Sequence, residues 1–202
     1  MTTTTIFLLS PAHCAGKRAR MLMNSGAIPL AEQLNGDGAT LGEVFSFMSS
    51  LYFRGKLAYA NAFGAPPQGW PGALVIAPGR GLVSADLRIR TTDLQAMALV
   101  PVDPDEPRYT DPLIRDATAL ERALGRDGRV VLLGSLATSK YVGPLTQVFG
   151  DRLHFPIAFV GRGDMSRGGL MLRCAREGTR LDYAPVEGAQ RHGSRPPRLP
   201  QR

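Results

Sequence analysis

The chain has 202 residues, of which 44% are hydrophobic and 20% charged, and its formal net charge is +7. This composition excludes a disordered or fibrous chain and suffices for one domain with a full hydrophobic core. No apolar run approaches the roughly 20 residues of a membrane span, the start lacks a signal peptide's basic segment, and two cysteines are too few for a disulfide framework. We therefore expect a cytoplasmic protein without a metal site or cofactor, and the oligomeric state is left open.

The positive charge is concentrated at the end of the chain. Arginines outnumber lysines 21 to 3, and no acid follows Glu187. Four arginines lie beyond that point and supply four of the seven net charges: Arg191, Arg195, Arg198 and Arg202. We predict a single α/β domain over residues 1–186 and a basic, proline-rich tail over 187–202 that is extended or disordered. A phosphate-bearing partner fits this charge, although the body itself is not strongly basic.

In the first half of the chain, a buried strand is predicted at 6–9 and a helix from Lys17 to Met23. Residues 24–38 look irregular, with one helical turn near 31–34. Thr40 to Glu43 matches a capping box and begins a long helix over 41–63. Its predicted buried stripe, in which Gly55 would let another element pack closely, is Val44, Phe47, Met48, Leu51, Gly55, Ala58 and Ala62.

In the second half, buried strands are predicted at 73–77 and 129–133, and an extended run at 155–160. Residues 87–100 mix strand and helix signals, and 101–107 reads as a surface loop. Asp111 followed by Pro112 predicts a helix start, with the helix ending near Leu124. A further helix is predicted over 138–149, and short elements at 170–175 and 181–184.

Strands that alternate with helices, each strand a continuous apolar run, indicate a three-layer α/β/α fold with a mostly parallel central sheet. Ligands of such sheets bind beyond the carboxyl ends of the strands. The loops that follow the predicted strands are rich in glycine and polar residues, and lie at 10–16, 78–81, 134–139 and 161–169. We expect them to form one composite site.

The stretch 161–169 holds four glycines, two arginines, a carboxylate and a hydroxyl. Glycine lets the backbone approach a ligand closely, and arginine offers a planar fork of donors to phosphate. We therefore predict an anion-binding loop in which Arg162, Gly163, Arg167 and Gly168 contact phosphate, while Asp164 and Ser166 act in catalysis. The alternative is a glycine-rich turn in which Asp164 caps the next element and the arginines are solvated.

Two further segments carry candidate residues. After the first strand, His13 is a candidate acid or base, and Lys17 and Arg18 are candidate phosphate contacts at a helix start. This loop is not a P-loop, because the spacing is one residue too long and Arg18 replaces the Mg²⁺-binding hydroxyl. On the long helix, Arg54 and Lys56 are candidate phosphate contacts. The alternative is that all these side chains are ordinary solvated surface groups.

Two stretches in order, Ser50–Ala60 and Val75–Leu82, resemble a pattern of YaaA-like proteins, which implies DNA or nucleotide chemistry. The loops at 10–16 and 161–169, with Val131–Gly134 between them, resemble in their order the uracil-DNA glycosylase superfamily, which implies a three-layer α/β/α fold. The chain departs from that superfamily in its first loop, which lacks Asp-Pro and Glu-x-Pro-Gly, and in its late loop, which lacks His-Pro-Ser.

The sequence therefore predicts an enzyme that acts on a nucleotide or nucleic acid, with N-glycosidic bond chemistry as the specific expectation. Asp164 would stabilise positive charge on the sugar or activate water, and Ser166 and His13 would position the leaving base or the nucleophile. One alternative is a non-catalytic module that binds DNA or RNA. The other is an enzyme that acts on a small molecule unrelated to nucleic acid.

Overall fold

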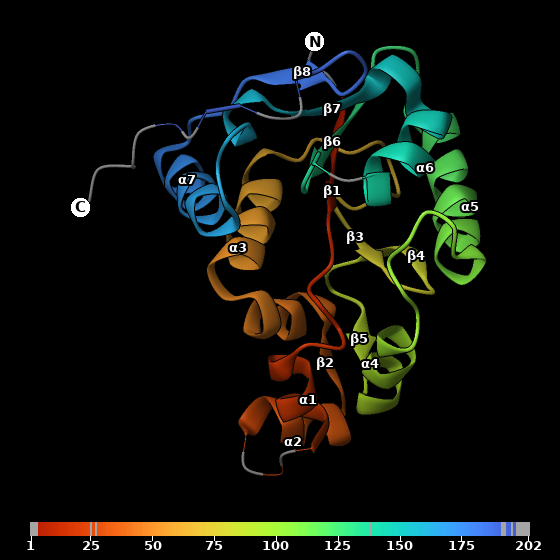
Figure 1. Ribbon diagram of the computed structural model, residues 1–202, viewed down its shortest axis with the longest axis vertical. Helices are drawn as coiled ribbons and strands as arrows, with labels where there is room; N and C mark the ends of the chain where they lie inside the picture. The colour runs from red at the N-terminus through yellow and green to blue at the C-terminus, as the bar shows by residue number, and fades with distance from the viewer. Residues whose placement is uncertain are drawn as a thin grey trace.

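A computed structural model describes residues 4–24, 26, 28–137, 139–190, 193–194 and 196. Within these residues the chain is a mixed α/β protein whose main sheet has six strands, in the order β4-β3-β1-β6-β7-β8 (Figure 1). The four central strands are parallel, as predicted, and the two edge strands are antiparallel to their neighbours. The strands are β1 Thr5–Leu9, β3 Ala73–Ala77, β4 Gly81–Ser84, β6 Arg129–Leu133, β7 Leu153–Pro156 and β8 Tyr183–Pro185.

The central strands β1 and β3 are buried along their whole length, so the side chains on both of their faces are covered. In β1, Phe7 and Leu9 pack into a core with α3 and α7, whereas Ile6 and Leu8 pack into a second core with α5 and α6. The helices are α1 Lys17–Asn24, α2 Pro29–Asn35, α3 Leu41–Phe63, α4 Thr91–Ala98, α5 Pro107–Ala123, α6 Ser139–Phe149 and α7 Asp164–Glu177.

A smaller group of elements lies beyond the carboxyl ends of β1 and β3. It consists of α1, α2, α4 and a two-stranded ladder formed by β2 Ala39–Thr40 and β5 Arg88–Ile89 (Figure 1). Residues 24–38, expected to be mainly irregular, thus contain a full helix, because Pro29 sits at the first helical position and fixes its start. No helix in the described part of the chain has the length and apolarity needed to cross a bilayer.

The long helix α3 has the predicted limits and capping box but is broken at Ser50, whose φ of 48° and ψ of −126° are not helical. A break changes the rotation of the residues that follow, so the predicted stripe does not continue past it. Ala62 is exposed. Of the predicted stripe beyond the break only Gly55 is fully buried, and the other residues buried there are Tyr52, Phe53, Lys56, Tyr59, Ala60 and Phe63.

Gly55 does allow a second element to pack closely, as expected, and that element is α7. A Cβ atom on Gly55 would lie 2.5 Å from the carbonyl oxygen of Gly168, and a Cβ atom on Gly168 would lie 2.6 Å from the carbonyl oxygen of Leu51. Both distances are shorter than van der Waals contact, so the two glycines determine how near α3 and α7 approach each other.

Several predicted element boundaries were wrong, and the short element predicted at 170–175 is part of the longer helix α7. The helix predicted from Asp111 begins at Pro107 with Glu106 as N-cap, because this pair supplies the same start signal five residues earlier. The strand predicted at 155–160 is β7, which ends at Pro156 before the 3₁₀ turn Ile157–Phe159. A second 3₁₀ turn, Gly150–Arg152, precedes β7. Arg191, Arg195, Arg198 and Arg202, and with them most of the predicted tail, lie outside the described residues.

Candidate functional site

The carboxyl ends of β1 and β6 form the point where the chain changes direction across the sheet. The connection from β1 leads to β3 on one side of β1, and the connection from β4, which pairs with β3, leads to β6 on the other side. Such a reversal is where open α/β sheets bind ligands. Ser10 follows β1 here and donates its backbone N–H to Leu133 at the end of β6, 3.3 Å away.

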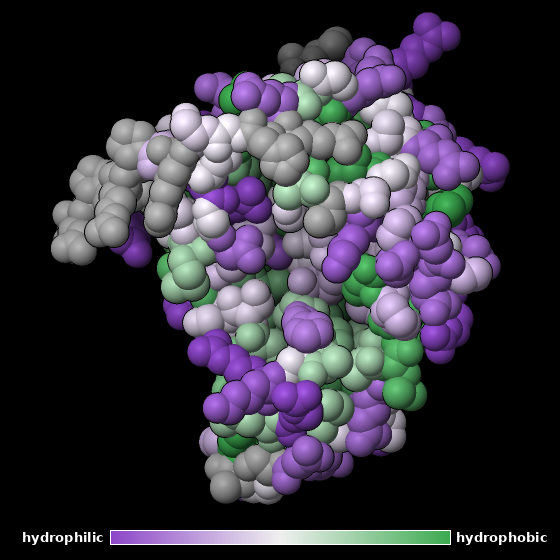
Figure 2. Space-filling model, in the orientation of Figure 1, coloured by the Kyte–Doolittle hydropathy of each residue, from purple (hydrophilic) through white to green (hydrophobic). Residues whose placement is uncertain are grey.

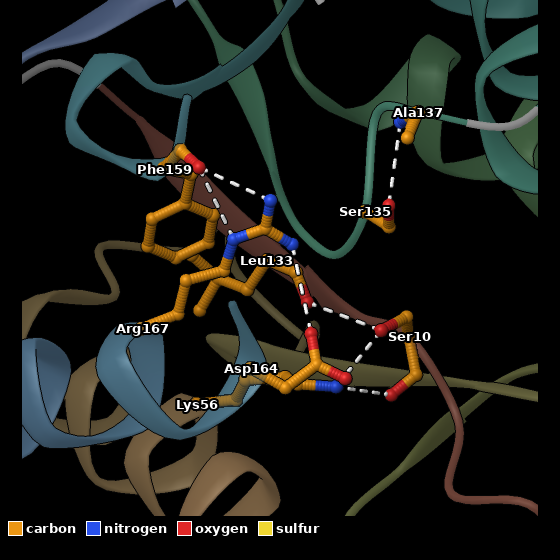
Figure 3. A network of polar contacts seen from close by, with 8 residues as sticks. All are labelled: Ser10, Lys56, Leu133, Ser135, Ala137, Phe159, Asp164 and Arg167. Carbon is orange, nitrogen blue, oxygen red and sulfur yellow. Dashed lines mark hydrogen bonds and ion pairs between the residues drawn. The ribbon is translucent and has the colours of Figure 1, made fainter. Parts of the chain in front are cut away.

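A buried lysine lies against this end of β1. The Nζ atom of Lys56, from α3, donates to both the carbonyl oxygen and the Oγ atom of Ser10 at 2.8 Å (Figure 3). The Ser10 hydroxyl in turn donates to the carbonyl oxygen of Leu133 at 3.4 Å. Lys56 is 1% exposed and Ser10 is 4% exposed. These contacts hold α3 to the ends of β1 and β6.

Burial lowers the pKa of Lys56 from 10.5 to about 7, because the charged ammonium loses its hydration. The negative charge of Asp164 opposes this shift, and the positive charge of Arg167 adds to it. Lys56 therefore changes its protonation state near neutral pH, which is the range in which a general acid or base works best.

Asp164 and Arg167 come from the first turn of α7. The Arg167 guanidinium donates to the carbonyl oxygen of Phe159 through Nε at 3.2 Å and Nη2 at 3.1 Å (Figure 3). Its Nη1 atom lies 3.7 Å from the Asp164 carboxylate. The Asp164 side chain is 66% exposed, whereas that of Arg167 is 13% exposed. An accessible carboxylate therefore lies at the rim of the buried polar groups.

Tyr52 completes the group. The Nζ atom of Lys56 lies 4.0 Å from the centre of the Tyr52 ring, and burial raises the pKa of Tyr52 to about 12. Burial also raises the pKa of Tyr141, which packs against the second core with α5 and α6. Burial raises the pKa of the Cys14 thiol to about 12, which makes it a poor nucleophile.

We call the set Ser10, Tyr52, Lys56, Asp164 and Arg167 the Ser10–Lys56 cluster. The Tyr52 hydroxyl is buried and has no hydrogen-bond partner among the described residues. Arg167 is near enough to lower its pKa, but the pair lacks hydrogen-bond geometry. A buried hydroxyl without a protein partner is costly.

The predicted glycine-rich loop is shorter than expected, because α7 begins at Asp164. Gly163 is the exposed N-cap residue of α7. Arg162 donates from Nη1 to the Ser166 hydroxyl at 3.2 Å. Gly168 is buried in the contact with α3. Direct phosphate contact, predicted for Gly168 and for Lys56, does not fit these two positions, since neither reaches the surface.

The other candidate residues lie apart from Asp164. His13 is exposed and lines a pocket of about 190 Å³ with Pro78, Met97 and Lys140. Arg18 and Arg54 line an open hollow of about 530 Å³, and Lys17 is exposed at the start of α1. Strongly hydrophilic side chains gather over α1 (Figure 2). The described contacts do not join His13 to Asp164, so the structure does not assemble the predicted pair.

Ser10 and Tyr52 were not predicted as site residues. Tyr52, Lys56, Tyr59 and Phe63 recur at the i, i+4, i+7 and i+11 positions of one helical stripe, a pattern that could have indicated a buried lysine. Ser10 directly follows a buried strand, which is also a usable signal.

Among the described residues, no three His, Cys, Asp or Glu side chains gather closely enough to hold a metal ion. Comparisons with family models, with curated proteins and with solved structures found no match to the chain. The function must therefore be inferred from the chain's own residues and their arrangement.

Proposed function

We propose that this protein is an enzyme that hydrolyses the N-glycosidic bond of a nucleotide or nucleic acid at the Ser10–Lys56 cluster. The observation that carries the proposal is an accessible carboxylate, Asp164, at the rim of a buried group in which Lys56 titrates near neutral pH. Perturbed titratable groups at the ligand-binding edge of a parallel sheet are typical of active sites. The three-layer α/β/α arrangement is part of the same proposal.

The chemistry requires a group that stabilises positive charge on the sugar and accepts a proton. As the bond from C1′ to the base nitrogen breaks, its electron pair leaves with the base and positive charge develops on the sugar. The ionised Asp164 stabilises that charge and takes a proton from the attacking water, whose oxygen bonds to C1′. The departing base is protonated from water, so the products are the free base and a sugar with a 1′-hydroxyl.

The neighbouring residues set the position and charge of the reacting groups. Arg167, held by Phe159, keeps the Asp164 carboxylate at the rim. Ser166, which accepts a hydrogen bond from Arg162, supplies a hydroxyl two residues from Asp164.

The test is release of free base, measured by chromatography, from nucleotides and from single- and double-stranded DNA and RNA that include damaged bases. We expect Asp164→Asn to lower kcat by about 100-fold or more, as for loss of a general base. Asp151→Asn, at an exposed carboxylate in the 3₁₀ turn before β7, is the matched control and should retain activity. No base release from any substrate, or full activity of Asp164→Asn, would refute the proposal.

A non-catalytic nucleic-acid-binding module remains the second candidate, and the exposed basic residues Lys17, Arg18 and Arg54 favour it. It predicts salt-sensitive binding. It also predicts that Asp164→Asn leaves binding unchanged or strengthens it, because the substitution removes a negative charge near the phosphates.

A further inference from the structure

We infer that the hollow at the break in α3 binds a segment of single-stranded nucleic acid. Its described lining residues are Arg18, Met21, Ser46, Phe47, Ser50 and Arg54. In this arrangement the two arginines contact phosphates and the apolar side chains contact a base. Single-stranded nucleic acid would then be the substrate class of the proposed enzyme, and this part of the inference rests on the proposed function. Binding of the strand to the hollow is tested separately from base release.

The hollow exists because α3 is broken. In a continuous helix, the carbonyl oxygen of Phe47 would accept the N–H of residue 51. With Ser50 outside helical geometry, Arg18 from α1 donates to that carbonyl from Nη1 at 3.1 Å. The positive φ of Ser50 is costly for a residue with a Cβ atom, and such conformations cluster at ligand sites. The break therefore joins α1 to α3 and leaves the hollow between them.

The charge of the hollow suits an anion. Its two cationic side chains come from different elements, Arg18 from α1 and Arg54 from α3, and the lining residues include no carboxylate. Arg54 is exposed. Arg18 commits one N–H to Phe47, and a guanidinium carries five N–H groups, so donors remain for a phosphate. The hydroxyls of Ser46 and Ser50 add two uncharged donors.

The shape of the hollow selects among phosphate-bearing ligands. A pocket for a free nucleotide encloses most of its ligand, whereas this hollow of about 530 Å³ is open and shallow, which suits a chain passing over it. Its apolar part includes Phe47 and Met21, and Met21 is 43% exposed. A duplex presents stacked and paired bases that cannot cover this surface, whereas a single strand can place a base on it.

The position of the hollow connects it to the proposed active site. Arg54 lies on the same helical segment after the break as Tyr52 and Lys56 of the Ser10–Lys56 cluster. The carbonyl of Leu51, in the first turn of that segment, packs against Gly168 of α7, the helix that begins with Asp164. A strand held by Arg54 is therefore attached to the helix that carries Tyr52 and Lys56.

The experiment measures binding of a fluorescein-labelled oligothymidylate, single-stranded or paired with oligoadenylate, by fluorescence anisotropy over a salt series. We expect the single strand to bind more tightly than the duplex. Arg54→Gln should reduce the slope of log K against log salt concentration by about 0.7. Met21→Ser should weaken binding about fivefold at every salt concentration without changing the slope, because it removes apolar contact but no charge.

The matched control is Arg122→Gln, which removes an equal charge from an exposed position on α5, on the other face of the sheet. If Arg54→Gln and Arg122→Gln behave alike, or if the duplex binds better than the single strand, the inference is overturned. Base release with an unchanged KM in Arg54→Gln would overturn it while leaving the proposed function intact. Arg54-dependent binding without base release from any substrate would support it and refute the proposed function.

Discussion

Replacing Lys56 with methionine should remove a specific pH dependence of stability. In the unfolded chain Lys56 keeps its proton up to about pH 10.5, whereas in the folded protein it releases the proton above about pH 7. Between these values the unfolded state binds more protons, so the free energy of unfolding rises with pH. The contribution is fully present above pH 10.5 and is lost as the pH falls to 7.

The magnitude follows from the size of the pKa shift. Each unit corresponds to about 1.4 kcal/mol, so the whole shift amounts to about 5 kcal/mol, and about 2 kcal/mol of it develops between pH 7 and pH 9. Methionine has a similar length and no charge. We therefore expect the difference in unfolding free energy between wild type and Lys56→Met to move in favour of the wild type by about 2 kcal/mol over this range.

The assay is urea unfolding at a series of pH values, followed by circular dichroism. Lys17→Met, which changes an exposed lysine in the same way, is the control and should parallel the wild type. Asp164→Asn should move the transition to lower pH, since the Asp164 charge raises the pKa of Lys56. Parallel stability curves for wild type and Lys56→Met would show that Lys56 keeps its proton in the folded protein and would refute the reasoning.

Three further substitutions test the packing and the helix ends. Gly168→Ala should destabilise the protein by about 1–3 kcal/mol in chemical unfolding, because the new Cβ atom meets the backbone of Leu51 and Tyr52. The control is Gly143→Ala, whose new Cβ atom meets nothing within 4 Å and should not destabilise the protein. Equal losses of stability in the two variants would contradict the close packing of α3 and α7. Ser50→Gly should raise the free energy of unfolding by about 1 kcal/mol, since glycine tolerates the positive φ, and a loss of stability would show that the serine conformation is not strained. Thr40→Ala should cost about 1 kcal/mol, because it removes the Thr40 hydroxyl that accepts the Glu43 N–H and binds the Glu43 carboxylate, and no change in the melting temperature would contradict the capping box.

Local patterns in the sequence were sufficient for much of the fold. The strands at 73–77 and 129–133 and the capped helix at 41–63 have the predicted bounds, because continuous apolar runs and a capping box are local signals. Their alternation predicted the mostly parallel sheet. The start of α5 was misplaced because two proline-containing start signals compete within six residues.

The candidate site depended more on tertiary structure. The sequence patterns singled out Asp164, Arg167 and Lys56, but they predicted that Lys56 contacts phosphate at the surface. Lys56 is buried because the break at Ser50 turns this part of α3 toward the ends of β1 and β6. A helix break at a serine has no reliable local signal, since its strain is balanced by contacts such as that of Arg18 with Phe47.

The sequence by itself thus determined which segments form strands and helices and which residues carry charge, since burial periodicity and end signals act over a few neighbouring residues. Only the tertiary structure decided that Ser10, Lys56, Tyr52 and Asp164 meet, because they come from β1 and its loop, α3 and α7, more than 150 residues apart at the extremes. The lowered pKa of Lys56 results from this packing, because the loss of hydration depends on all the groups packed around the ammonium and not on its sequence neighbours.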